Sequence, residues 1–111
     1  MIICGDGEQV RDFIFIDDVV RANILARDYA GRSAEIFNIA SGTETSVLNL
    51  AKLIIELTKS KSKIVFQPAR AGDILYSQAD ISKARKVLGW QAEVKLEDGL
   101  RETIDSLRRE G

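Results

Sequence analysis

Residues 7–19 read Gly7-Glu8-Gln9-Val10-Arg11-Asp12-Phe13-Ile14-Phe15-Ile16-Asp17-Asp18-Val19. The continuous apolar run from Phe13 to Ile16 is typical of a strand that is covered on both faces. The two aspartates that follow can accept hydrogen bonds from the free N–H groups of a first helical turn, and they favour the positive end of a helix dipole. The sequence therefore predicts a strand over 13–16 and then a helix capped by Asp17 or Asp18.

Strand and helix patterns continue to alternate along the rest of the chain. Further strands are predicted over 36–40 and 63–67, and further helices after the cap residue Ser46, over 80–89 and over 96–107. Interleaved elements of this kind predict a mixed α/β fold in a single domain over residues 1–111.

The composition excludes several classes of protein. An apolar fraction of 45% and a charged fraction of 30% are ordinary for a globular protein. Sixteen basic and seventeen acidic residues leave a net charge of −1, so no overall field attracts nucleic acid or anionic lipid. No apolar run suits a membrane span, and no lead sequence suits a secretory signal. The single cysteine, Cys4, fits a reducing compartment, and we expect a cytoplasmic protein.

No complete set of catalytic residues is present in the sequence. Histidine, the commonest general base and zinc ligand, is absent. Gly5 and Gly7 share the first spacing of a dinucleotide-binding turn, but Val10 stands at its third glycine position. Neither tyrosine is followed by a lysine four residues later, as short-chain dehydrogenases require. We therefore expect that this chain alone binds no cofactor and turns over no substrate.

Two arginines stand where structure alone does not require a positive charge. Arg11 precedes the predicted strand, and Arg70 lies in a loop between Pro68 and Gly72. A guanidinium matches phosphate oxygens two at a time, so two arginines on fixed backbone would clamp a diphosphate. A purely structural alternative stays open, in which each arginine forms a surface ion pair worth about 0–1 kcal/mol. Its partners would be Asp12, Asp17 or Asp18 for Arg11, and Asp73 for Arg70.

Four segments, taken in order, resemble the extended short-chain dehydrogenase/reductases that act on nucleotide sugars, the NAD-dependent epimerase/dehydratase family. They are Ile3–Val19, Ile36–Gly42, Pro68–Ile74 and Ala79–Trp90. The resemblance covers nearly the whole chain and implies the C-terminal, substrate-binding part of that fold. It implies that Arg11 and Arg70 contact the nucleotide diphosphate and that Asp73 helps to hold the nucleotide. It also implies that Phe13 is an aromatic residue near the substrate.

The resemblance further implies a parent enzyme that uses NAD. The N-terminal Rossmann half of that family, with its glycine-rich loop and its catalytic tyrosine and lysine, has no counterpart in this sequence. The implied partners are a nucleotide diphosphate sugar, the Rossmann half, and a second copy of the chain through exposed strands. Two alternatives remain: a stand-alone module that binds nucleotide sugars or docks onto a partner, and a remnant that only folds and associates.

Overall fold

A computed structural model describes residues 1–29, 35–72 and 79–110 of the chain. The elements follow in the order β1 (Ile2–Cys4), β2 (Val10–Arg11), α1 (Ile16–Asp28), β3 (Thr45–Ser46), α2 (Val47–Thr58), β4 (Val65–Gln67), the π-helical turn η1 (Ala84–Leu88) and α3 (Leu96–Glu110). This order confirms the mixed α/β class. Among the described residues, no helix has the length and apolar character needed to cross a membrane.

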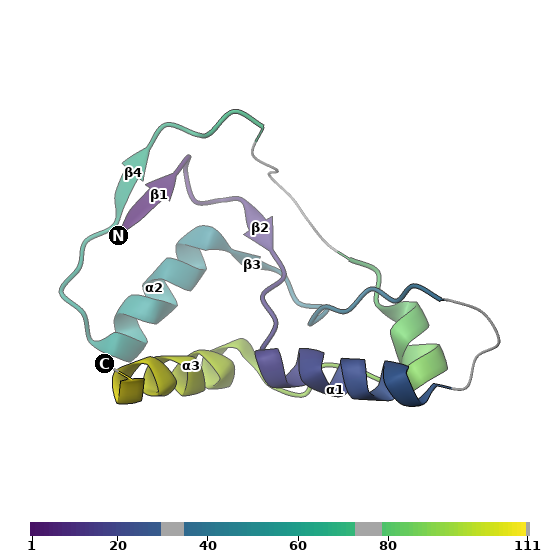
Figure 1. The fold of residues 1–111 in the computed structure, drawn as a ribbon. Helices are drawn as coiled ribbons and strands as arrows, with labels where there is room; N and C mark the ends of the chain where they lie inside the picture. The colour runs from purple at the N-terminus through teal and green to yellow at the C-terminus, as the bar shows by residue number, and fades with distance from the viewer. Residues whose placement is uncertain (30–34, 73–78, 111) are drawn as a thin grey trace.

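The strands form two small sheets. β1 lies parallel to β4, with Ile2 opposite Val65, and β2 lies antiparallel to β3, with Arg11 opposite Thr45. Figure 1 shows α2 and α3 on one side of the molecule, below the β1–β4 pair, and α1 on the other side beside η1. The coil segments 12–15 and 89–95 connect the two sides.

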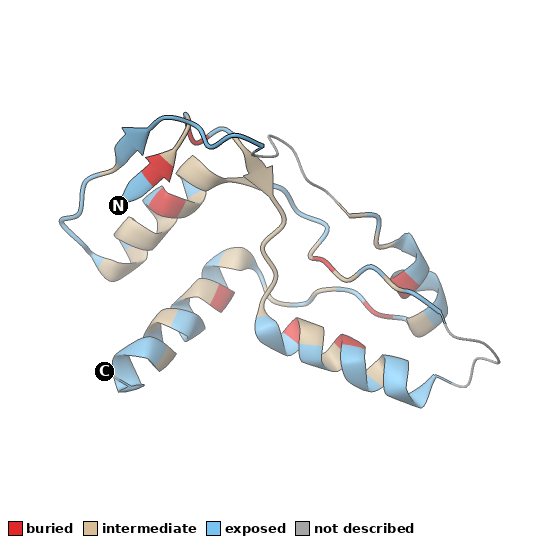
Figure 2. Ribbon diagram, turned by 45° about the horizontal axis from the view of Figure 1, so that its top comes forward, coloured by how far each residue is buried: buried red, intermediate tan, exposed pale blue. Residues whose placement is uncertain are grey.

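The molecule is open rather than compact. It measures 52 × 36 × 19 Å, and its radius of gyration is 16.7 Å, against about 13 Å for a compact chain of this length. The buried residues are correspondingly few and scattered (Figure 2). The buried apolar residues are Ile3, Ala22, Ala40, Ala51, Ala84 and Trp90.

Trp90 is the centre of the core between α1 and η1. Its side chain is fully buried and packs with Ala22 of α1 and Ala84 of η1. Half-buried apolar side chains surround this cluster: Ile14, Leu25, Phe37, Ile39, Leu88 and Ala92.

Predictions that rested on local signals are confirmed. Ser46 caps α2, because its Oγ accepts a hydrogen bond from the Asn49 amide at 3.1 Å. Gly89 ends η1 in the left-handed conformation that glycine adopts without strain (φ 66°). The last predicted helix is α3, and the third predicted strand is β4, shortened to Val65–Gln67.

The predicted strands over 13–16 and 36–40 do not form. Residues 12–15 and 35–40 are coil, and α1 begins at Ile16, with Phe15 rather than an aspartate in the cap position. A strand needs a neighbouring backbone to complete its hydrogen bonds. Within the described residues, the two sheets consist of other strands, so neither run has a strand partner. The run 36–40 is held instead by side-chain packing and by side-chain hydrogen bonds, such as the one that the Lys83 Nζ donates to the Ile36 carbonyl at 3.0 Å. The sequence interpretation also missed β1, β2 and β3.

Candidate functional site

The site predicted from the sequence is built on β2 and the glycine turn before it. Gly5 and Gly7 both have positive φ values, 87° and 79°. A Cβ at Gly7 would lie 2.8 Å from the Leu48 Cβ, so this turn is pressed against the start of α2. Two backbone hydrogen bonds also join residues 7–9 to the start of α2. The Leu48 amide donates to the Gly7 carbonyl at 2.9 Å, and the Val47 amide donates to the Gln9 carbonyl at 3.0 Å. The backbone that leads to Arg11 is thereby fixed.

Arg11 is half-buried at the end of β2. Its Nη1 donates to the Val10 carbonyl at 2.8 Å. The predicted structural pairings of Arg11 with Asp12, Asp17 or Asp18 are wrong, because no ion pair among the described residues joins Arg11 to any of these aspartates. Asp18 pairs with Arg21 at 3.5 Å, and no ion pair among the described residues involves Arg11. The guanidinium therefore keeps donors that are available to an anion.

Asp12 is a residue whose role the sequence interpretation missed. Its Oδ1 accepts hydrogen bonds from the Ser41 amide at 2.8 Å and from the Ser41 Oγ at 2.7 Å. Its Oδ2 accepts a third bond from the Gly42 amide at 2.8 Å. Both carboxylate oxygens are thus occupied by a turn that lies 29 to 30 positions further along the chain.

Phe13 is half-buried and lines two neighbouring hollows. One hollow, of about 340 Å³, is partly polar and is also lined by Ser41, Thr43 and Thr45. The other, of about 210 Å³, is largely apolar and lies between Phe13 and helices α2 and α3. An aromatic side chain next to a partly polar hollow suits the position near a substrate that was predicted for it.

Arg70 is exposed in the coil after β4. Its neighbour Ala69 lies against the glycine turn, since a Cβ placed at Gly5 would be 3.6 Å from the Ala69 Cβ. Arg11 thus lies on β2, which follows the glycine turn, and Arg70 lies in the coil that packs against this turn after β4 (Figure 1). The predicted site residue Asp73, which is also the predicted structural partner of Arg70, lies outside the described residues.

A further hollow, of about 510 Å³, lies beside the Ser41–Gly42 turn and is lined by Asp80 and Arg85. The amide of Ser82 donates to the Asp80 Oδ1 at 2.9 Å. Hydrogen bonds from Ser82, with a smaller contribution from the charge of Lys86, lower the pKa of Asp80 below its ordinary value. Asp80 therefore stays ionised at neutral pH and caps the helical turn that leads into η1.

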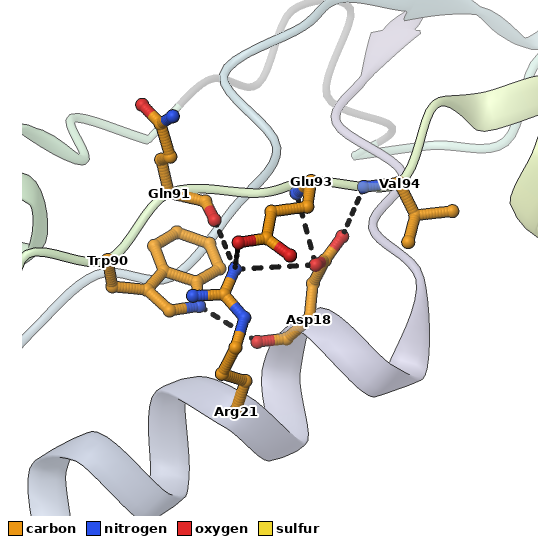
Figure 3. A network of polar contacts seen from close by, with 6 residues as sticks. All are labelled: Asp18, Arg21, Trp90, Gln91, Glu93 and Val94. Carbon is orange, nitrogen blue, oxygen red and sulfur yellow. Dashed lines mark hydrogen bonds and ion pairs between the residues drawn. The ribbon is translucent and has the colours of Figure 1, made fainter.

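Asp18 belongs to a structural network and not to the candidate site (Figure 3). It is only 2% exposed, and its carboxylate accepts hydrogen bonds from the Glu93 and Val94 amides, both at 3.1 Å. Its backbone carbonyl accepts from the Trp90 Nε1 at 2.9 Å. Arg21 donates to the Gln91 carbonyl and lies over the Trp90 ring at 5.7 Å. This network fixes α1 to the coil before α3.

The glycine turn does not fit a dinucleotide. A dinucleotide-binding turn leads into a helix whose N-terminus meets the pyrophosphate. Here the turn after β1 leads instead into the strand β2.

Residues 1–103 match the family model described as GDP-mannose 4,6 dehydratase. The chain belongs to this family. It is 40% identical over 106 residues to the UDP-glucose 4-epimerase of Mycolicibacterium smegmatis, covering 96% of this chain and 34% of that protein. The recognition as an NAD-dependent epimerase/dehydratase is thereby confirmed.

Solved structures of family members resemble the chain closely. The UDP-glucose 4-epimerase of Thermotoga maritima, solved with UDP-glucose, is 44% identical with a TM-score of 0.92, covering 99% of this chain and 35% of that one. The UDP-glucuronic acid 4-epimerase of Bacillus cereus, solved with UDP-glucuronic acid and NAD, is 30% identical with a TM-score of 0.90, covering 99% and 35%. The chain thus spans about a third of the length of the relatives that it matches.

Proposed function

We propose that this chain forms the nucleotide-sugar-binding part of an NAD-dependent epimerase or dehydratase, with a UDP-sugar as the substrate. The observation that carries the proposal is the position of Arg11, on a β2 strand fixed against α2, with its guanidinium in no ion pair among the described residues. The T. maritima relative, whose structure holds UDP-glucose, supports the choice of a UDP-sugar.

In this proposal Arg11 and Arg70 hold the two phosphates of the nucleotide. Phe13 and the polar rim of the hollow beside it, which includes Ser41 and Thr43, lie next to the sugar or the base. The carboxylate of Asp73 helps to hold the nucleotide. When bound, NAD would supply hydride chemistry, and the part of the relatives beyond the matched third would hold it. The role of this chain is then to orient the substrate, which accelerates a reaction by reducing the entropy lost on reaching the transition state.

The direct test is a titration of the chain with UDP, followed by calorimetry and by amide chemical shifts. We expect binding that is roughly 10- to 100-fold weaker in Arg11→Ala or Arg70→Ala, since a charge-assisted hydrogen bond contributes about 1.5–3 kcal/mol where water is excluded. Arg27→Ala is the matched control, because Arg27 lies on α1 and pairs with Asp28 at 3.0 Å. Equal losses in all three variants would contradict a local clamp.

A second experiment places the chain in an enzyme. The matched third of the T. maritima UDP-glucose 4-epimerase is replaced by this chain, and epimerisation of UDP-glucose is measured with and without the Arg11 and Arg70 substitutions. Activity that depends on both arginines supports the proposal. A chimera that folds but is inactive, together with a chain that does not bind UDP, would refute it.

A further inference from the structure

Asp12 places a negatively charged carboxylate directly after Arg11 in the sequence. A free carboxylate in that position would pair with the guanidinium and compete with a phosphate for it. Here both Asp12 oxygens instead accept hydrogen bonds from Ser41 and Gly42, at 2.7 to 2.8 Å. The carboxylate is therefore engaged away from Arg11.

The turn that Asp12 binds leads directly into the partner strand of Arg11. The Ser41 Oγ also accepts from the Thr43 amide at 3.1 Å, which closes the turn, and β3 begins two residues later at Thr45. Thr45 lies opposite Arg11 in the sheet. Asp12 and the β2–β3 pairing thus hold the same two segments together from adjacent positions.

This support matters because the pairing of β2 with β3 is short. It consists of two residue pairs, Val10 with Ser46 and Arg11 with Thr45, and an isolated two-stranded pair is only marginally stable. Three hydrogen bonds to a charged carboxylate are stronger than the same number of neutral ones. Gly42 is required in the turn, since its φ is 80° and a Cβ there would lie 3.0 Å from the Ile81 Cδ1.

We propose that Asp12 is a positioning residue of the nucleotide-sugar site, which holds the Arg11 end of β2 to the Ser41–Gly42 turn and keeps its own charge away from the Arg11 guanidinium. This inference rests on the proposed function, because it concerns the use of Arg11 as a phosphate ligand. In an Asp12→Asn variant, an NH₂ group replaces one carboxylate oxygen, so that a backbone N–H of the Ser41–Gly42 turn meets a donor and no longer an acceptor. Arg11 then loses its fixed position.

The test is a double-mutant cycle on the affinity for UDP, measured with the 111-residue chain well below its unfolding temperature. We expect Asp12→Asn to weaken UDP binding on the order of tenfold in the wild-type background. In an Arg11→Ala background the same substitution should change affinity by less than about twofold, because the residue through which it acts is already gone. Asp28→Asn is the matched control, since Asp28 also accepts a hydrogen bond, from the Arg27 Nε at 3.0 Å, but at the exposed end of α1.

The outcomes separate the two proposals. A tenfold loss that disappears in the Arg11→Ala background supports positioning. An equal loss in both backgrounds would show a general structural effect and would overturn the inference, as would an unchanged affinity of Asp12→Asn. If the wild-type chain does not bind UDP, the same cycle is measured on the epimerase activity of the chimera, and a chimera that folds but is inactive overturns both the proposed function and the role of Asp12.

Discussion

Replacing Asp18 by alanine tests the network that joins α1 to the coil before α3. The substitution removes two hydrogen bonds to a charged acceptor, from the Glu93 and Val94 amides, and leaves the Trp90 bond to the backbone carbonyl in place. Each charged hydrogen bond contributes about 1.5–3 kcal/mol, which sets an upper limit of about 3–6 kcal/mol for the two. Water offsets part of this lost free energy by hydrogen-bonding to the released amide, because Glu93 is exposed. We therefore expect a loss of about 2–4 kcal/mol, with about 1 kcal/mol at most coming from the ion pair with Arg21.

The matched control is Asp17→Ala in the same first turn of α1. Asp17 is exposed, so its removal should cost only the helix-dipole term of about 0.3–1 kcal/mol. Urea unfolding at pH 7 measures both variants, with far-UV circular dichroism for the helices and the fluorescence of Trp90, the single tryptophan, for the core. The melting temperature of Asp18→Ala should fall by roughly 10–15 °C. A difference below about 0.5 kcal/mol between the two variants would refute the reasoning.

Three further predictions concern α3, the turn that leads into η1, and α1. Gly99→Ala should destabilise the chain by up to about 2 kcal/mol in thermal unfolding, because the new Cβ would lie 3.0 to 3.3 Å from Phe15 atoms. This overpacking exceeds the gain in helix propensity. A raised melting temperature would show that Phe15 moves aside without cost. The pKa of Asp80 is lowered in the folded chain, so its stabilising effect is present above its ordinary value of 3.8 and is lost as the pH falls below it. The stability gap between wild type and Asp80→Asn should therefore close in acid, and a gap that widens there would contradict this. Three exposed apolar side chains on α1, Ile16, Val20 and Ile24, should make the chain associate. Sedimentation equilibrium should show a smaller assembly for Val20→Glu but not for the control Asn23→Glu. A wild-type chain that is monomeric at high concentration would contradict this prediction.

Local signals in the sequence predicted the helices well. Ser46 caps α2 because a hydroxyl three residues before a free amide is sufficient, and Gly89 ends η1 because only its own φ is involved. The apolar spacing of Leu96, Leu100 and Leu107 needs no distant partner to indicate α3. Each of these features is decided within about one helical turn of sequence.

The strands and the candidate site depend on contacts between residues that are far apart in the sequence, and these features were predicted less well. The run Phe13–Ile16 has the composition of a buried strand, but a strand also needs a neighbouring backbone, and no composition supplies one. Asp12 was missed because its partners lie 29 and 30 positions away. Asp18 was taken for a cap because its place in a first helical turn is visible in sequence, whereas its contact with residues 93 and 94 is not.

The parallel pair of β1 and β4 imposes an order on folding. The Met1 amino group donates to the Lys63 carbonyl, 62 positions along the chain, and β1 has no other strand partner among the described residues. Closing so long a loop is entropically costly, and non-local pairings of this kind form slowly. During synthesis, Ile2 and Ile3 must also wait until residue 67 has left the ribosome. We therefore expect β1 to join the structure only after α2 has formed.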